Sequence, residues 1–162
     1  MAAGSASWSF TEGDFGAITT VLQKFLFESN ARCALLVDRS GQLVATVGEP
    51  PRFDPTAFAT LTAADFSAND QLAKLIGEND FSSLFHQGDK ESMYLADVAR
   101  RVILVVLFDS RTTLGLVRLK MKETVIQLTS LFEQIFSRSA AGQAQAPGLL
   151  AGADDEIDRL FG

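Results

Sequence analysis

The run of residues 101–108 is almost wholly apolar, and it constrains the fold more than any other part of the chain. A strand that is buried on both faces has this pattern, because neither of its sides meets water. Two shorter strand-like runs, 81–87 and 92–98, precede it, and the turns between the three runs are short. The sequence therefore predicts a meander in which residues 101–108 form a central strand.

Two more strands are expected nearer the N-terminus. The short β-rich runs 34–38 and 43–47 are separated by Arg39, Ser40 and Gly41. The glycine supplies the backbone freedom that a tight hairpin turn needs. The two runs are therefore predicted to pair with each other.

Three amphipathic helices complete the predicted elements. Asp14 stands where it caps the first helix, and Asp54 followed by a proline starts the second, which Gly77 ends. Ser110 or Thr112 is expected to cap the third. The apolar positions expected to face the core are Phe15, Ile18, Leu22 and Phe25 in the first helix, Phe58, Leu61, Leu72, Leu75 and Ile76 in the second, and Leu114, Val117, Met121, Val125, Leu128, Phe132 and Ile135 in the third.

This order predicts an α+β domain, αββαβββα, with a five-stranded antiparallel sheet flanked by helices on both faces. The domain is expected to span residues 10–138, after a flexible N-terminal lead at 1–9. Residues 139–152 are rich in Ala, Gly, Gln and Pro and are predicted to be a flexible linker. Residues 153–162 form a terminal acidic segment with amphipathic helical spacing.

Composition excludes several classes of function. A formal net charge of -6 argues against nucleic acid as a partner, and no apolar run approaches the roughly 20 residues of a membrane-spanning helix. The single cysteine, Cys33, cannot form an intrachain disulfide, and a cytoplasmic location is expected. His86 is isolated from other metal-ligating residues, and no nucleophile, paired-carboxylate or phosphate-loop motif is present. We therefore expect no catalytic residues, metal or cofactor.

Several segments resemble the roadblock/dynein light chain family, and within it the MglB group of bacterial gliding-motility regulators. They are LLVD at 35–38 with GQL at 41–43, LAKLIGEN at 72–79, FDSRTTLGLVR at 108–118 and DDEIDRLF at 154–161. The resemblance implies a homodimer in which the strands near residues 81–87 pair to continue one sheet across both subunits. It also implies that two regulator subunits bind one small Ras-like GTPase of the MglA type and accelerate GTP hydrolysis. No arginine is donated, because the GTPase's own arginine and glutamine are pushed into place, so neither Arg52 nor Arg111 is expected to act as an arginine finger.

The second helix carries small and polar side chains roughly opposite its expected apolar stripe. From the pattern alone this stripe is either a partner contact or an ordinary exposed face. The resemblance implies that it is the GTPase interface, with Ser67 and Gln71 the firmest positions. The predicted interface residues are Thr60, Ala63, Ala64, Ser67 and Gln71.

The terminal segment is too short to be a stable helix alone, so it either docks or stays loose. Its apolar residues fall at i, i+3 and i+4, which favours docking. The resemblance implies that it binds the GTPase away from the helix platform and assists nucleotide exchange. The predicted docking residues are Asp154, Asp155, Ile157, Leu160 and Phe161.

Two alternatives to GTPase activation stay open at this point. The first is a roadblock subunit that only assembles complexes, and the second is a small-ligand sensor domain, which shares the helix-flanked antiparallel sheet. A sensor needs a cavity with convergent polar groups, and the strand faces here are expected to be filled. For an MglB-like protein the resemblance further implies a role in cell polarity and gliding motility, with enrichment at a cell pole.

Overall fold

Three helices and five strands alternate in the predicted order in the computed structural model, which describes residues 10–144. The helices are α1 (Glu12–Ser29), α2 (Pro55–Leu75) and α3 (Leu114–Ala144). The strands are β1 (Cys33–Asp38), β2 (Leu43–Gly48), β3 (Ser83–Gln87), β4 (Ser92–Val98) and β5 (Val102–Phe108). No helix within the described range is long and apolar enough to span a membrane.

The strands form one antiparallel sheet in the order β2-β1-β5-β4-β3. Strand β5 is central and pairs with β1 on one side and β4 on the other. All of its residues are buried except the half-buried Leu107. The apolar run therefore predicted the centre of the sheet correctly.

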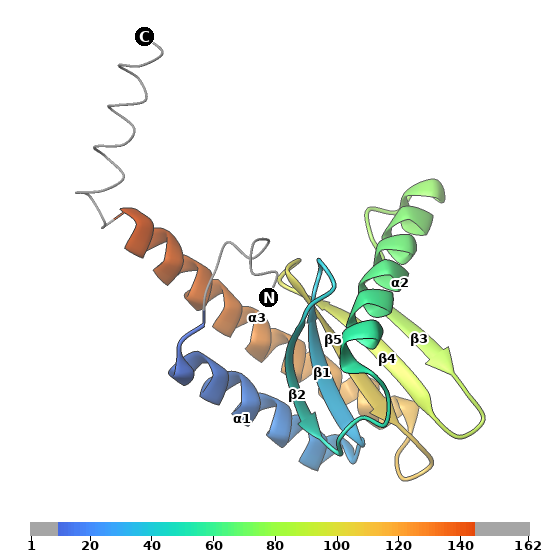
Figure 1. The fold of residues 1–162 in the computed structure, drawn as a ribbon. Helices are drawn as coiled ribbons and strands as arrows, with labels where there is room; N and C mark the ends of the chain where they lie inside the picture. The colour runs from blue at the N-terminus through green and yellow to red at the C-terminus, as the bar shows by residue number, and fades with distance from the viewer. Residues whose placement is uncertain (1–9, 145–162) are drawn as a thin grey trace.

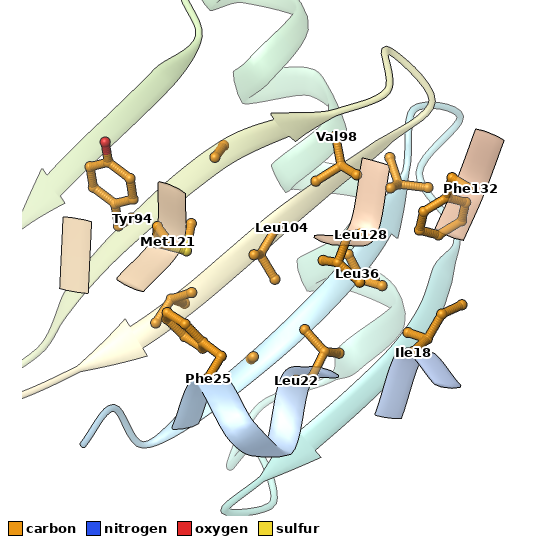
Figure 2. Packing of buried hydrophobic residues seen from close by; sticks show 14 of the residues in the cluster. Ile18, Leu22, Phe25, Leu36, Tyr94, Val98, Leu104, Met121, Leu128 and Phe132 are labelled. Carbon is orange, nitrogen blue, oxygen red and sulfur yellow. The ribbon is translucent and has the colours of Figure 1, made fainter. Parts of the chain in front are cut away.

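The sheet separates two layers of helix, with α1 and α3 on one face and α2 on the other (Figure 1). Successive strand residues point to opposite faces, so Leu36 and Leu104 pack under α1 and α3 while Leu35 and Val105 pack under α2. Figure 2 shows the larger of the two cores, where α1 and α3 meet the sheet. Its labelled residues are Ile18, Leu22, Phe25, Leu36, Tyr94, Val98, Leu104, Met121, Leu128 and Phe132.

The helix ends differ from the predictions in detail. Thr11, not Asp14, is the N-cap of α1, and Asp14 closes a capping box by accepting from the backbone N–H of Thr11 at 2.8 Å. Helix α3 is capped by Thr113, whose hydroxyl accepts from the N–H of Leu116 at 3.2 Å. It continues to Ala144, past the expected domain boundary at residue 138 and into the segment predicted to be a linker. Its regular helical spacing from Val117 to Ile135 is followed by alanines, which favour helix.

The buried stripe of α2 is not the one predicted. Asp54 caps the helix and Gly77 follows its end with a positive φ of 87°, as expected. However, four of the five predicted core residues are exposed: Leu61, Leu72, Leu75 and Ile76. The residues that face the sheet instead are Ala59, Thr62, Ala63, Phe66, Asn69 and Ala73. Small side chains let the helix lie close to the strands, and the fully buried Phe66 is the large anchor that sets its rotation.

Candidate protein-binding surface on helix α2

Helix α2 presents two different exposed stripes once its buried stripe is fixed. Each residue advances by about 100° around a helix, so positions three, four and seven apart share a side. Counted from Phe66, the small and polar residues fall on one flank, Leu61 and Leu72 fall on the other, and the exposed Leu75 lies between the two flanks. In addition to the buried stripe that faces the sheet, the outer surface of α2 therefore has a polar flank and an apolar flank.

The small and polar stripe contains four of the five residues predicted to bind a partner. Thr60, Ala64, Ser67 and Gln71 are exposed and follow one another at i, i+4, i+7 and i+11. The fifth, Ala63, is only 9% exposed, so it does not belong to this surface. It points at the β1–β2 turn, where a Cβ added to Gly41 would lie 3.8 Å from the Cβ of Ala63.

One exposed small residue on this surface was not predicted. Ala68 lies next to Ser67 and one turn beyond Ala64, and it is exposed. Its spacing of four from Ala64 was the signal in the sequence that would have found it. The outward surface of the middle of α2 is therefore made of small side chains, which permit close approach of another backbone.

The apolar stripe faces the edge of the sheet formed by β3. Asp65 lies on the same flank as Leu61 and Leu72, and its Oδ2 is 2.6 Å from Nε2 of His86 on β3. Leu61, Leu72 and Ile76 are 69%, 57% and 70% exposed. Exposed apolar residues gathered on one flank of a helix mark an interaction surface more often than singly scattered ones do.

Strand β3 adds an unpaired edge beside that stripe. Among the strands within residues 10–144 it pairs only with β4, through five register positions from Ser83 opposite Ala96 to Gln87 opposite Ser92. Its other side leaves backbone N–H and C=O groups without strand partners. The Asp65–His86 contact places the apolar stripe of α2 next to the free edge of β3.

Arg39, in the β1–β2 turn, holds α2 in this orientation. Its Nη1 donates to Asp70 of α2 at 2.7 Å, its Nη2 donates to Asp97 of β4, and its guanidinium lies 5.0 Å from the ring centre of Phe66. Burial opposes the charge, but the hydrogen bonds to Asp97 and Asp70 outweigh it and raise the pKa of Arg39. This three-element contact, called here the Arg39 clamp, was not predicted from the sequence.

The other residues weighed as functional candidates have ordinary surroundings. Arg111 donates to Asp109 at 3.0 Å and to Glu49 at 3.1 Å, and these hydrogen bonds raise its pKa. Burial raises the pKa of the Cys33 thiol, which disfavours the reactive thiolate. Within the described residues, no group of three His, Cys, Asp or Glu side chains is placed to hold a metal ion.

Arg52 is exposed and borders a hollow of about 370 Å³ beside the Pro50–Pro51 loop. The floor of this hollow is formed by Cys33 and Leu107, and Arg32, Glu49 and Glu91 stand around it. Arg32 and Glu49 pair with each other at 2.8 Å, so the rim charges largely satisfy one another. The predicted docking residues Asp154, Asp155, Ile157, Leu160 and Phe161 lie outside the described residues.

Comparison with known proteins gives consistent matches along most of the chain. A family model described as the Roadblock/LC7 domain matches residues 17–108. Myxococcus xanthus MglB is 46% identical, with a TM-score of 0.71 over 74% of this chain and 98% of that one. The gliding protein MglB of Thermus thermophilus is 32% identical, with a TM-score of 0.75 over 80% of this chain and 98% of that one. A structure described as MglB with tetrameric arrangement is 31% identical, with a TM-score of 0.76 over 81% of this chain and 98% of that one.

Proposed function

Since this chain belongs to the Roadblock/LC7 family, and within it to the MglB group, we propose that it is a GTPase-activating regulator of a small Ras-like GTPase of the MglA type. The observation that carries the proposal is the double exposed surface of α2, with an apolar stripe toward β3 and a small, polar stripe beside it. The regulator contributes no reacting group of its own. Control of cell polarity and gliding motility from the cytoplasm, with enrichment at a cell pole, follows from the same proposal.

The first step of the proposed mechanism is a two-fold dimer. Strand β3 pairs with β3 of a second copy, which extends the sheet across both subunits and satisfies the free edge. The same two-fold axis brings the apolar stripes of the two α2 helices together, so that Leu61 and Leu72 leave water. In such a two-fold interface each subunit contributes the same patch. The free edge of β3 and the apolar stripe of α2 can both belong to that patch because they lie next to each other.

The second step is the binding of one GTPase across the paired helices. When the leucines of the two helices face each other, the small and polar stripe of each subunit stays exposed on the outer surface. This stripe consists of Thr60, Ala64, Ser67 and Gln71. This surface, called here the α2 platform, has small side chains that let the GTPase approach closely. Contact with its mobile loops would hold the GTPase's own arginine and glutamine in position for hydrolysis, which supplies the positioning and electrostatic terms of phosphoryl transfer.

The direct test of this function is phosphate release by an MglA-type GTPase from the same organism. Adding the dimer to the GTP-loaded GTPase should raise the hydrolysis rate at least tenfold, a change of about 1.4 kcal/mol in the barrier. The chain alone with GTP is the control and should release no phosphate. Tight binding without faster hydrolysis would instead support the scaffold alternative. A small-ligand sensor is disfavoured because side chains fill both faces of the sheet.

A second prediction concerns the acidic terminal segment. Truncation after Gly148 should leave the dimer and its melting curve unchanged, and it should slow nucleotide exchange or weaken GTPase binding. A tethered segment raises its own effective concentration near the bound GTPase, so even weak contacts would be lost measurably. Release of a fluorescent GDP analogue, followed with the full chain and the truncated one, measures the effect. Equal exchange and equal affinity would remove the segment from the mechanism.

A further inference from the structure

Lys74 extends the α2 platform by one helical turn and is its only charged member. Ser67, Gln71 and Lys74 follow one another at i, i+4 and i+7, so the lysine side chain leaves the helix on the same flank. All three residues are exposed. A cation therefore stands at the end of a stripe of otherwise small and uncharged side chains.

The carboxylates of α2 are all engaged elsewhere, while Lys74 is not. Asp54 caps the helix by accepting from the N–H of Thr56 at 3.0 Å, Asp65 contacts His86, and Asp70 contacts Arg39. Within residues 10–144 the Lys74 ammonium has no ion pair, and the nearest acid that follows it, Glu78, makes none with it. In a chain with a net charge of -6, the outer surface of α2 thus presents an uncompensated positive charge.

We propose that Lys74 pairs with a carboxylate of the GTPase, so that the α2 platform selects a partner that is acidic where it meets the C-terminal half of α2. The inference rests on the proposed function and adds the chemistry of the recognised surface to it. In the dimer the two-fold axis supplies two such lysines, one on each side of the shared platform. Complementary charge at such positions speeds association and rejects partners of the wrong sign.

An anionic membrane is the other surface that a lysine beside leucines could meet, and magnitudes argue against it. Each basic residue contributes about 1 kcal/mol near an anionic leaflet, and lasting attachment needs clusters of about four to eight. Lys74 is the only free cation on the helix itself, and the net charge of -6 opposes approach to the leaflet. One or two directed ion pairs to a protein surface fit this sparse charge better.

The test compares two charge reversals on opposite sides of the sheet. Lys74→Glu should slow association with the MglA-type GTPase, loaded with a non-hydrolysable GTP analogue, by about tenfold at low salt, and the salt dependence of the rate should shrink. Lys122→Glu is the matched control, because Lys122 is also exposed and without an ion pair but lies on α3. Lys122→Glu should leave both the association rate and the stimulated hydrolysis unchanged, because α3 lies on the opposite face of the sheet from the α2 platform (Figure 1). Lys74→Arg should behave as the original chain.

Each outcome separates this inference from the function on which it rests. If the original dimer stimulates hydrolysis and Lys74→Glu associates as fast as it does, only the inference fails. Equal slowing by Lys122→Glu would show a general charge effect and also overturn it. If the original dimer neither binds nor stimulates the GTPase, the proposed function itself fails. A membrane-binding role would be indicated by two results together. The original chain, but not Lys74→Glu, would co-sediment with phosphatidylserine vesicles, and the two would associate with the GTPase equally fast.

Discussion

Ser67→Arg or Gln71→Arg is expected to abolish the stimulation of GTP hydrolysis while the chain still folds and dimerises. Both side chains are exposed in the middle of the α2 platform. A long arginine in this surface of small residues holds the partner's backbone away. Loss of a central contact of this kind costs about 3 kcal/mol, or about a hundredfold in affinity.

Phosphate release and binding affinity, measured at equal concentrations of each variant, check this prediction. Gln23→Arg is a matched control, because Gln23 is also an exposed helical glutamine but lies on α1, on the opposite face of the sheet. The thermal unfolding midpoint and the dimer mass should stay as in the original chain. Normal stimulation by both platform variants would show that the GTPase binds elsewhere.

The double variant Leu61→Glu with Leu72→Glu is expected to be monomeric and inactive as a regulator. Each leucine that is fully buried at an interface contributes about 1.5–3 kcal/mol, and the two-fold axis makes each substitution count twice. Four glutamates brought together at the seam would add like-charge repulsion and the cost of desolvation. Because both leucines are exposed in the single chain, the fold of each subunit should survive.

Light scattering at micromolar concentration measures the expected change from dimer to monomer. Leu119→Glu is the control: Leu119 on α3 is 55% exposed, close to the 57% of Leu72, but α3 lies on the opposite face of the sheet from α2 (Figure 1). That variant should stay dimeric and should still stimulate the GTPase. A dimer that persists in the double variant would mean that the subunits associate through another surface.

The sequence predicted most of the fold because local patterns determine most of it. The apolar run of β5, the glycine of the β1–β2 turn and the Asp54 cap of α2 each depend on residues close in sequence. The rotation of α2 about its own axis depends instead on which of its side chains contact the sheet. Hydrophobicity ranks leucine above alanine, so the leucine stripe was assigned to the core, whereas the alanines and Phe66 are the residues that meet the sheet. A single sequence does not distinguish an apolar stripe that covers its own sheet from one that a second chain covers.

Two features of the candidate site were beyond prediction for different reasons. The Arg39 clamp joins residues 31 and 58 positions apart, and no short motif marks such a contact. The sequence does not single out Lys74, because a lysine in the last turn of a helix is already favoured by the negative end of the helix dipole. Only the spatial continuation of Ser67 and Gln71, together with the engaged carboxylates around it, distinguishes it from an ordinary exposed lysine.

The Arg39 clamp fixes both exposed stripes of α2 in one orientation relative to the sheet. The stripe that meets a second copy and the stripe that meets the GTPase lie about 100° apart on the same helix, so neither can turn without the other. A substitution that broke the contact of Arg39 with Asp70 or Asp97 would therefore weaken both dimerisation and GTPase binding. Natural variation in this group should accordingly preserve the contacts that fix the orientation of α2, because dimerisation and GTPase binding both depend on that orientation.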